Sequence, residues 1–367
     1  MKKVCFFNQS SVHYRSAIYE LMDNELQCDF YFGDSRPGNI LPYENAKLKN
    51  FAGTLKNIRI GPFYWQKGAI SLLKKPYKYL LTPGDTYCLS TWVIFFLSKL
   101  FYKKKKVFVW AHGAYGEEGW IKRRIINLKY WLIDGAFLYG NRAKNILQQY
   151  GVPERKLHLI YNSLDYDKQK ELRCGLVSSD VFRRHFNNSN NNIIFIGRLT
   201  KVKKLHMILE AVSLCKSQGI MFNVTFIGDG PERSTLEQLV DTLSLKHQVW
   251  FYGACYNEGE NAELIYNADL CVSPGNVGLT AMHSLMFGTP VITHNHFAMQ
   301  MPEFEAIEEG VSGAFFKEND SNDLSLVLSS WVTSNKDRNS IRQVCYNIMD
   351  TKYNPHKQIE ILINTLQ

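Results

Sequence analysis

Two basic residues stand directly after a short apolar run in the C-terminal half of the sequence. Within Phe195–Lys204 the run ends at a glycine, Arg198 follows, and Lys203 comes five residues after Arg198. Doubly wound folds bind their ligands at the carboxyl edge of parallel strands, and two cations at such an edge suit a diphosphate. A solvated basic turn is the competing interpretation, because charge clusters of this size are often only surface.

A glycine-rich turn further along the chain has the pattern of an anion site. Val272–Val291 reads as a strand, a turn, a helix that begins near Val277 to Leu279, and a second turn that leads to another strand. The amide N–H groups at a helix start have no acceptor within the helix, and the helix dipole adds to their attraction for an anion. Gly278 lets a phosphate approach the backbone closely because it has no side chain. Glycines placed only for a tight turn are the competing interpretation.

Both segments belong to an alternation of short β-rich runs and helical stretches that starts at Asn192. Strands separated by helices of that length predict a parallel, doubly wound α/β sheet. The N-terminal half shows the same alternation less regularly, and 367 residues exceed what one core usually holds, so we expect two Rossmann-like domains. We place the N-terminal domain at residues 1–170, a linker at 171–191 and the C-terminal domain at 192–350. A C-terminal helix at 351–367 is a candidate to return to the N-terminal domain.

The net charge of +9 arises in the N-terminal half, because the rest of the chain carries slightly more acidic than basic residues. A basic field favours anionic lipid head groups or nucleic acid, although a solvated surface explains any single patch such as Lys103–Lys106 equally well. No apolar stretch reaches the roughly 20 residues of a bilayer span, and the N-terminus has no apolar segment of signal-peptide length. We expect a cytoplasmic protein, with the inner face of the plasma membrane as a candidate location, and no nucleic-acid partner.

Taken together and in this order, the two phosphate-binding segments resemble the nucleotide-sugar domain of glycosyltransferase family 4. Five further matches surround them: Ile227–Pro231, Phe251–Gly253, Asn267–Leu270, Met301–Glu303 and Gly310–Gly313. The resemblance covers about Asn192–Phe316 and implies a GT-B fold, with two Rossmann-like domains facing across a cleft. It also implies metal-independent transfer, with retention of configuration, of a hexose-type sugar from a nucleotide-diphosphate sugar to a glycan or lipid-linked acceptor. The process would be bacterial surface-polysaccharide assembly, and no further cofactor is expected.

The resemblance assigns roles to residues by position. It implies that five residues bind the donor diphosphate, the glycine and leucine through their backbone amides and the threonine through its hydroxyl: Arg198, Lys203, Gly278, Leu279 and Thr280. Glu303 is expected near the sugar or the diphosphate. The two cations would then balance the charge that develops on the departing nucleotide.

The sequence departs from the family pattern at two positions. The family has two glutamates eight positions apart around this helix start, and the match at Gly278 places Gly275 and His283 there. In the family the first glutamate contacts hydroxyls of the donor sugar and the second contacts those of the ribose. His283 is able to hydrogen-bond a ribose, whereas Gly275 has no side chain. A histidine packed under the loop is the competing interpretation of His283.

The N-terminal half resembles the family through three shorter segments: Asn8–Tyr19, Trp110–Gly113 and Ile160–Asp165. In the family the histidine of a His-Gly pair at this place contacts the donor sugar, so His112 is the predicted catalytic-side residue and Gly113 lies beside it on the acceptor side. A turn histidine bonded to the backbone is the alternative. Arg15 is predicted to meet an anionic acceptor, or else to form a surface salt bridge.

The sequence is also compatible with other functions. The loss of both glutamates suits a non-catalytic GT-B scaffold or regulatory protein, and a sugar-nucleotide epimerase would share the fold. Asp165–Asp167 matches a metal-binding D-x-D motif of a different glycosyltransferase fold, which we interpret as coincidence because it lies at the expected linker. We expect no metal site, since no paired histidine or cysteine motif is present.

Overall fold

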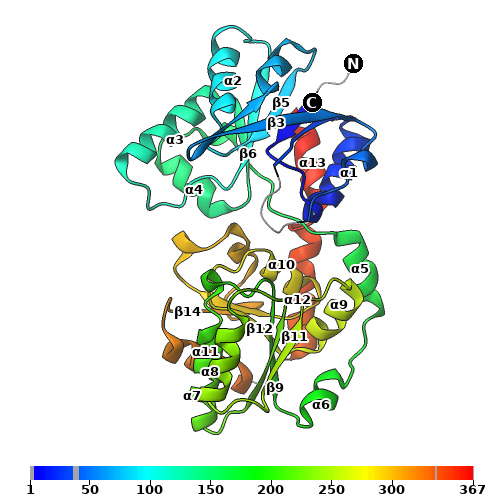
Figure 1. The fold of residues 1–367 in the computed structure, drawn as a ribbon, viewed down its shortest axis with the longest axis vertical. Coiled ribbons are helices and arrows are strands. Elements are labelled where there is room, and N and C mark those ends of the chain that lie inside the picture. The colour runs from blue at the N-terminus through cyan, green and yellow to red at the C-terminus, as the bar shows by residue number, and fades with distance from the viewer. Residues whose placement is uncertain (1–3, 36–40, 335–336, 367) are drawn as a thin grey trace. The chain divides into compact units, whose positions relative to one another are not determined.

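The computed structural model describes residues 4–35, 41–334 and 337–366, and the chain divides into two compact units (Figure 1). One unit consists of Met1–Asp165 together with Asn354–Gln367, and the other is Tyr166–Tyr353. The segment expected as a linker, residues 171–191, contains the end of one helix and all of α6 (Val181–Phe186), and both belong to the second unit.

The described part of the first unit contains an eight-stranded sheet with the order β4-β3-β2-β1-β5-β6-β7-β8. Its strands are β1 (Val4–Asn8), β2 (Asp29–Gly33), β3 (Phe51–Ile60), β4 (Phe63–Lys67), β5 (Tyr79–Pro83), β6 (Lys106–Ala111), β7 (Gly135–Leu138) and β8 (Leu157–Leu159). All neighbours pair in parallel except β3 and β4, which pair antiparallel. The central β1 is apolar on both faces, as a parallel strand covered on both sides requires.

Helices cover both faces of this first sheet. They are α1 (Ser16–Glu25), α2 (Leu89–Leu100), α3 (Trp120–Leu132), α4 (Asn141–Gln149) and α13 (Pro355–Leu366). Helices α2, α3 and α4 share one core cluster through Ile94, Ile126 and Ile146. Helices α1 and α13 share a second cluster through Ile18 and Leu362, and Figure 1 shows α13, the end of the chain, beside α1.

The described part of the second unit contains a six-stranded sheet, all parallel, with the order β11-β10-β9-β12-β13-β14. Its strands are β9 (Asn191–Ile196), β10 (Phe222–Ile227), β11 (Val249–Gly253), β12 (Leu270–Ser273), β13 (Val291–His294) and β14 (Gly313–Phe316). Helices α7 (His206–Ser217), α8 (Arg233–Thr242) and α11 (Ser321–Thr333) share one core cluster. Helices α5 (Tyr166–Gly175), α9 (Glu258–Asn267), α10 (Leu279–Met286) and α12 (Arg338–Thr351) pack with one another beside the sheet.

The two sheets confirm the predicted class of doubly wound α/β domains. In each, the strand order reverses next to the first strand, between β1 and β5 and between β9 and β12. Such a switch point is where folds of this class bind ligands, because the loops that leave the two strands diverge there. Across the described ranges, every helix is too short or too polar to cross a lipid bilayer.

Candidate functional site

Lys203 lies in the loop that leaves β9, at the switch point of the second unit. It ends the 3-10 turn Lys201–Lys203, and its Nζ donates to the backbone carbonyl of Asn276 at 2.6 Å and to the Asn276 Oδ1 at 3.0 Å. Burial lowers the pKa of Lys203 to about 8, the charge of Glu303 opposes this shift, and Arg198 adds to it. The ammonium group is therefore still mostly charged at neutral pH, and it is held inside the loop that leads to α10.

Glu303 and Arg198 lie close enough to Lys203 to affect its pKa, so the structure brings three of the predicted site residues together. Glu303 is buried in the 3-10 turn Pro302–Ala306. Arg198 is exposed and directly follows Gly197 at the end of β9. One exposed and one half-buried cation thus stand beside a buried carboxylate at this edge of the sheet.

Gly275 packs backbone to backbone against the turn that carries Lys203. Its amide donates to the carbonyl of Lys203 at 3.0 Å, and a Cβ built at Gly275 would lie 2.0 Å from the carbonyl oxygen of Val202. A side chain at this position would require the Lys201–Lys203 turn to move. The absence of the family's first glutamate therefore has a steric reason in this chain.

Gly278 forms the N-terminal boundary of α10. Its φ of +53° and ψ of −146° lie in a region that side-chain-bearing residues rarely adopt. No side chain caps α10, as is also the case for α7 and α8, whereas α9, α11 and α12 are capped by Asn257, Asp320 and Asp337. In the first turn of α10 the amide of Ala281 donates to the carbonyl of Gly278 at 3.1 Å, so the amides of Leu279 and Thr280 remain the natural partners of an anion.

The Thr280 hydroxyl is bonded within the protein. Thr280 Oγ1 donates to the carbonyl of Ile196 at 3.0 Å and thereby ties the start of α10 to the end of β9. The amide of Val277 is also bonded, to Oε1 of Gln300 at 2.9 Å. Because the single hydroxyl proton of Thr280 is directed at the backbone, its amide rather than its hydroxyl is the better candidate for a phosphate donor.

His283 lies in a side-chain network that links α10, α9 and α5. Its Nε2 is 2.9 Å from Oε1 of Glu258, and the same oxygen accepts from Nε2 of Gln169 at 2.7 Å. Burial alone would raise the pKa of Glu258, but the hydrogen bonds from His283 and Gln169 outweigh it and lower that pKa. A carboxylate thus stands next to the position where the family pattern has its second glutamate. Sequence reasoning missed Glu258, which follows the helix-capping Asn257 and has no motif around it.

The first unit has a pocket of about 850 Å³ where β1, β5 and β6 end. Many of its lining residues are aromatic: Phe6, Phe63, Tyr87, Trp92, Trp110, Tyr115 and Tyr139. The predicted acceptor-side residues Arg15 and Gly113 line the same pocket, as does the predicted catalytic-side residue His112. Gly113 leaves no space for a Cβ beside α4, because that atom would lie 2.8 Å from the Cβ of Ala143. This volume is in the range of small-molecule sites.

His112 directly follows β6 and is half-buried. Burial lowers the pKa of His112 to about 4, and the charge of Arg15 lowers it further. The imidazole is therefore neutral at physiological pH, which suits a hydrogen bond to a substrate hydroxyl better than proton donation as a general acid.

Arg15 is buried, with 8% of its surface exposed. Its Cζ lies 4.5 Å from the centre of the Trp110 ring, and its guanidinium donates to the hydroxyl of Tyr139. In residues 4–35, 41–334 and 337–366 the structure pairs no carboxylate with it. The alternative of a surface salt bridge is therefore wrong.

Comparison with known proteins gives the second unit a family. Residues 178–347 match the family described as glycosyl transferases group 1. An uncharacterised 41.2 kDa protein of the cps region of Klebsiella pneumoniae is 24% identical over 264 residues, which are 70% of this chain and 62% of that protein. The putative colanic acid biosynthesis glycosyltransferase WcaL of Salmonella typhimurium is 27% identical over 148 residues, 38% of this chain and 35% of WcaL. The chain thus spans less than two thirds of the length of these relatives.

The whole chain also resembles solved structures. The HepE protein (Alr3699) of Anabaena, crystallised in complex with UDP, superposes with a TM-score of 0.71 at 16% identity over 99% of both chains. At that identity the likeness shows the fold, which is the GT-B fold of two Rossmann-like domains, as predicted. Residues 178–347 of this chain therefore match the family glycosyl transferases group 1, and the chain has a GT-B fold.

Proposed function

We propose that the protein transfers a hexose-type sugar from a nucleotide-diphosphate sugar to a glycan or lipid-linked acceptor during bacterial surface-polysaccharide assembly. The donor would bind in the second unit and the acceptor in the first. The observation that carries this proposal is the meeting of Lys203 with the uncapped start of α10, since Lys203 is bonded to Asn276 only two residues before Gly278. The name of WcaL and the UDP in the HepE crystals support the same reading.

The chemistry follows from this arrangement of charges. The bond between the sugar C1 and the diphosphate oxygen breaks, a bond from C1 to an acceptor hydroxyl oxygen forms, and the hydroxyl proton passes to the departing diphosphate. Lys203, Arg198 and the α10 amides stabilise the charge that develops on that leaving group. We propose retention of configuration and transfer without a bound metal. Full activity after EDTA treatment would support the second point, and activity that returns only with a divalent cation would contradict it.

Calorimetry with a panel of nucleoside diphosphates tests the donor site. We expect the full chain to bind at least one of them, and we expect Lys203→Ala to weaken binding about tenfold or more, the usual scale for loss of a charged hydrogen bond. Lys201→Ala is the matched control, because Lys201 is exposed in the same turn. Absence of binding to any nucleoside diphosphate would favour a non-catalytic scaffold, and isomerisation of a free nucleotide sugar would favour an epimerase.

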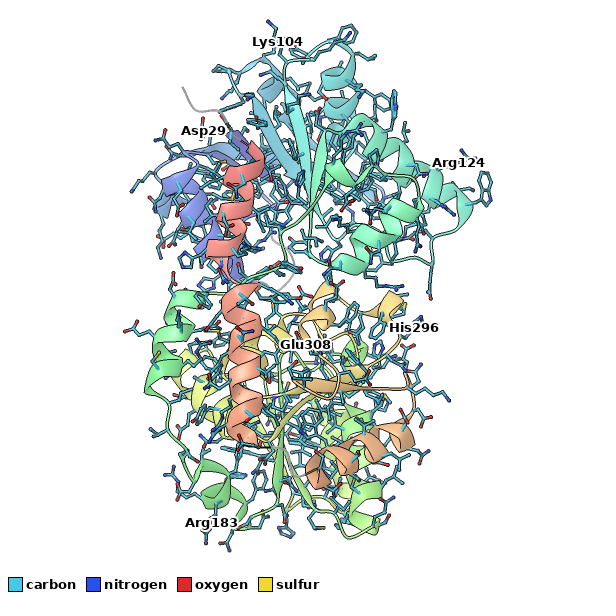
Figure 2. The ribbon with its side chains drawn as sticks, turned by 180° about the vertical axis from the view of Figure 1, so that it is seen from behind. Asp29, Lys104, Arg124, Arg183, His296 and Glu308 are labelled. Atoms are coloured by element: carbon cyan, nitrogen blue, oxygen red, sulfur yellow. The ribbon has the colours of Figure 1, made fainter. Side chains whose placement is uncertain are left out.

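We further propose that the first unit meets the anionic inner face of the plasma membrane through α2, α3 and the chain after α2. Large apolar side chains are exposed there: Phe96, Leu100, Phe101, Trp120, Ile121, Ile125, Leu128 and Trp131. Exposed basic residues accompany them, namely Lys103, Lys104, Lys122, Arg123 and Arg124, and Figure 2 shows Lys104 and Arg124 projecting outward. Apolar and cationic side chains exposed on two helices that contact each other suit an anionic bilayer interface.

Sedimentation with vesicles of anionic or zwitterionic lipid tests this contact. We expect the protein to prefer anionic vesicles, and we expect Trp120→Ser with Ile121→Ser to reduce the bound fraction several-fold. Leu326→Ser is the matched control, because Leu326 is 60% exposed on α11 of the second unit. Equal binding to both kinds of vesicle, or equal loss with the control variant, would contradict the membrane contact.

A further inference from the structure

The cluster around Arg15 contains more hydrogen-bond donors than the protein itself satisfies. Arg15 has tyrosines rather than carboxylates as neighbours: burial alone would lower its pKa, but Tyr139, Tyr19 and Tyr14 outweigh burial and raise it. A guanidinium offers five N–H donors, and a buried charge is normally paired. The Arg15 side chain thus remains a buried cation whose counter-charge the described residues do not supply.

Two more polar atoms beside Arg15 have no acceptor or donor partner in the described part of the chain. Trp110 is 6% exposed and its Nε1–H is unsatisfied, and Nδ1 of His112 is likewise buried and unsatisfied. Both residues line the 850 Å³ pocket together with Arg15. Trp110 lies under the guanidinium at 4.5 Å, and the His112 ring is 4.9 Å from that of Tyr139. Buried polar atoms are nearly always bonded in folded proteins, so this cluster is suited to a ligand.

The carboxylates of the pocket, Asp85 and Glu118, are engaged elsewhere. Glu118 accepts from the amides of Tyr115 and Gly116 and from the hydroxyl of Tyr150. Asp85 accepts from the amide of Tyr87, and its charge acts on Lys129, a second buried cation lining the pocket. The side chains with the largest effect on the pKa of Arg15 are tyrosines. The Arg15 side of the pocket is therefore positive.

Arg15 occupies the same place in the first unit that Lys203 occupies in the second. Each is the last residue of the 3-10 turn that follows the first strand at its switch point, at the same distance along the chain from the strand ends Asn8 and Ile196. The strand across each switch point also ends in a similar turn, Thr82–Asp85 (Thr-Pro-Gly-Asp) and Ser273–Asn276 (Ser-Pro-Gly-Asn). The position that presents a cation to the donor phosphates in our proposal thus presents a cation in the first unit too.

We propose that Arg15, Trp110 and His112 form an oxyanion subsite that binds a carboxylate or phosphate group of the acceptor. The inference rests on the proposed function, because it names the acceptor class of the same transferase: an anionic acceptor. A planar guanidinium matches both groups through paired N–H donors. The aromatic walls of the pocket suit the apolar faces of a sugar ring that carries the anion or is joined to it.

Ligand-observed NMR on the full chain distinguishes the two sources of the anion. The probes are methyl glucuronide, methyl glucoside and pyrophosphate, with UDP present in excess to occupy the second unit. A uronide that binds at least fivefold more tightly than the glucoside assigns the subsite to an acidic sugar. Stronger binding of pyrophosphate assigns it to a diphosphate linker. If neither anion binds more tightly than the glucoside, the proposal is overturned.

Trp110→Phe locates the binding, because it removes the indole N–H and keeps an aromatic ring under Arg15. We expect this variant to weaken binding of the preferred anion about threefold to tenfold and to leave UDP binding unchanged. Arg198→Ala is the control for the second unit and should leave anion binding unchanged. Anion binding that is lost with Arg198→Ala but kept with Trp110→Phe would overturn the proposal. If the unmodified protein does not bind UDP, that result contradicts the proposed donor site and not the oxyanion subsite.

A measurement of the melting temperature distinguishes a ligand-binding role of Arg15 from a purely structural one. If the guanidinium serves a ligand, Arg15→Met should keep or raise the melting temperature, because it removes a buried charge that lacks a counter-charge. The same variant should lose the preference for the anionic probe. A clear fall in melting temperature, together with an unchanged preference for the anion in Trp110→Phe, would show that the cluster only holds the fold and would overturn the proposal.

Discussion

The two units share one strand order at their switch points but present different chemical groups there. In the second unit the backbone dominates: Gly275 packs directly on the Lys203 turn, Gly278 adopts a φ of +53°, and α10 starts without a side-chain cap. In the first unit side chains dominate, with Arg15 and Trp110 in a pocket of about 850 Å³.

This difference suggests how the proposed donor and the proposed acceptor would be recognised. A diphosphate is common to many sugar donors, and backbone amides bind it whatever the surrounding side chains are. Acceptors differ in shape and charge, and a side-chain pocket is able to follow such differences because its residues change without altering the backbone. We therefore expect the second unit to be sensitive to changes that move its backbone, and the first unit to changes in single side-chain atoms.

Gly275→Ala should have the largest effect of any single substitution considered. The new Cβ would lie 2.0 Å from the carbonyl oxygen of Val202, so the turn that carries Lys203 must shift. We expect a loss of about 2 kcal/mol in the free energy of unfolding, as for other overpacked sites, and a loss of nucleotide binding. Urea unfolding checks this, with Gly175→Ala as control, because a Cβ at Gly175 has nothing within 4 Å. Equal stability of the two variants would contradict the packing account.

The pH dependence of nucleotide binding should report on Lys203. Its folded pKa of about 8 is below the ordinary value of 10.5, and the protonated form is the one that attracts a diphosphate. Affinity should therefore be highest below pH 8 and fall as the pH rises through 8, by at most about tenfold per pH unit. Calorimetry between pH 6.5 and 9.5 measures this, and Lys203→Arg should flatten the profile because arginine stays charged. A profile that Lys203→Arg leaves unchanged would assign the pH dependence to another group.

A smaller effect is expected at Glu258. If this carboxylate takes the part of the family's second glutamate, the protein should bind a ribonucleoside diphosphate several-fold more tightly than its deoxy analogues. Glu258→Gln should reduce that ratio toward one, because a neutral amide is a weaker acceptor than a carboxylate. Competition binding measures the ratio in both proteins. An unchanged ratio would leave Glu258 as a packing partner of His283 and Gln169 only.

Much of the structure of the second unit can be predicted from the sequence, because the patterns that indicate it lie within short segments. The apolar runs and helical stretches from Asn192 onward predict the parallel sheet, and the two glycine-rich segments place Lys203 and Gly278 at its carboxyl edge. The hairpin of β3 and β4 was not predicted, since β3 is largely exposed with scattered apolar residues and β4 is only five residues long.

The pocket of the first unit was predictable only in part. Arg15 and His112 stand in short motifs, but the partner of Arg15, Tyr139, is 124 residues away along the chain and joins it only through the tertiary fold. Trp110 Nε1 is buried without a hydrogen-bond partner among the described residues because of how several strands pack around it, and no local sequence pattern predicts that packing. Glu258 reaches His283 in the same way, from a different helix.

The claim that the two units bind different ligands is tested most directly by one crossed titration. UDP and the preferred anionic probe are each titrated into the unmodified protein, Lys203→Ala and Trp110→Phe. The account predicts that Lys203→Ala weakens UDP binding about tenfold and leaves binding of the anionic probe unchanged, while Trp110→Phe does the reverse. Equal weakening of the binding of both ligands by either variant would contradict the proposed separation of donor and acceptor sites.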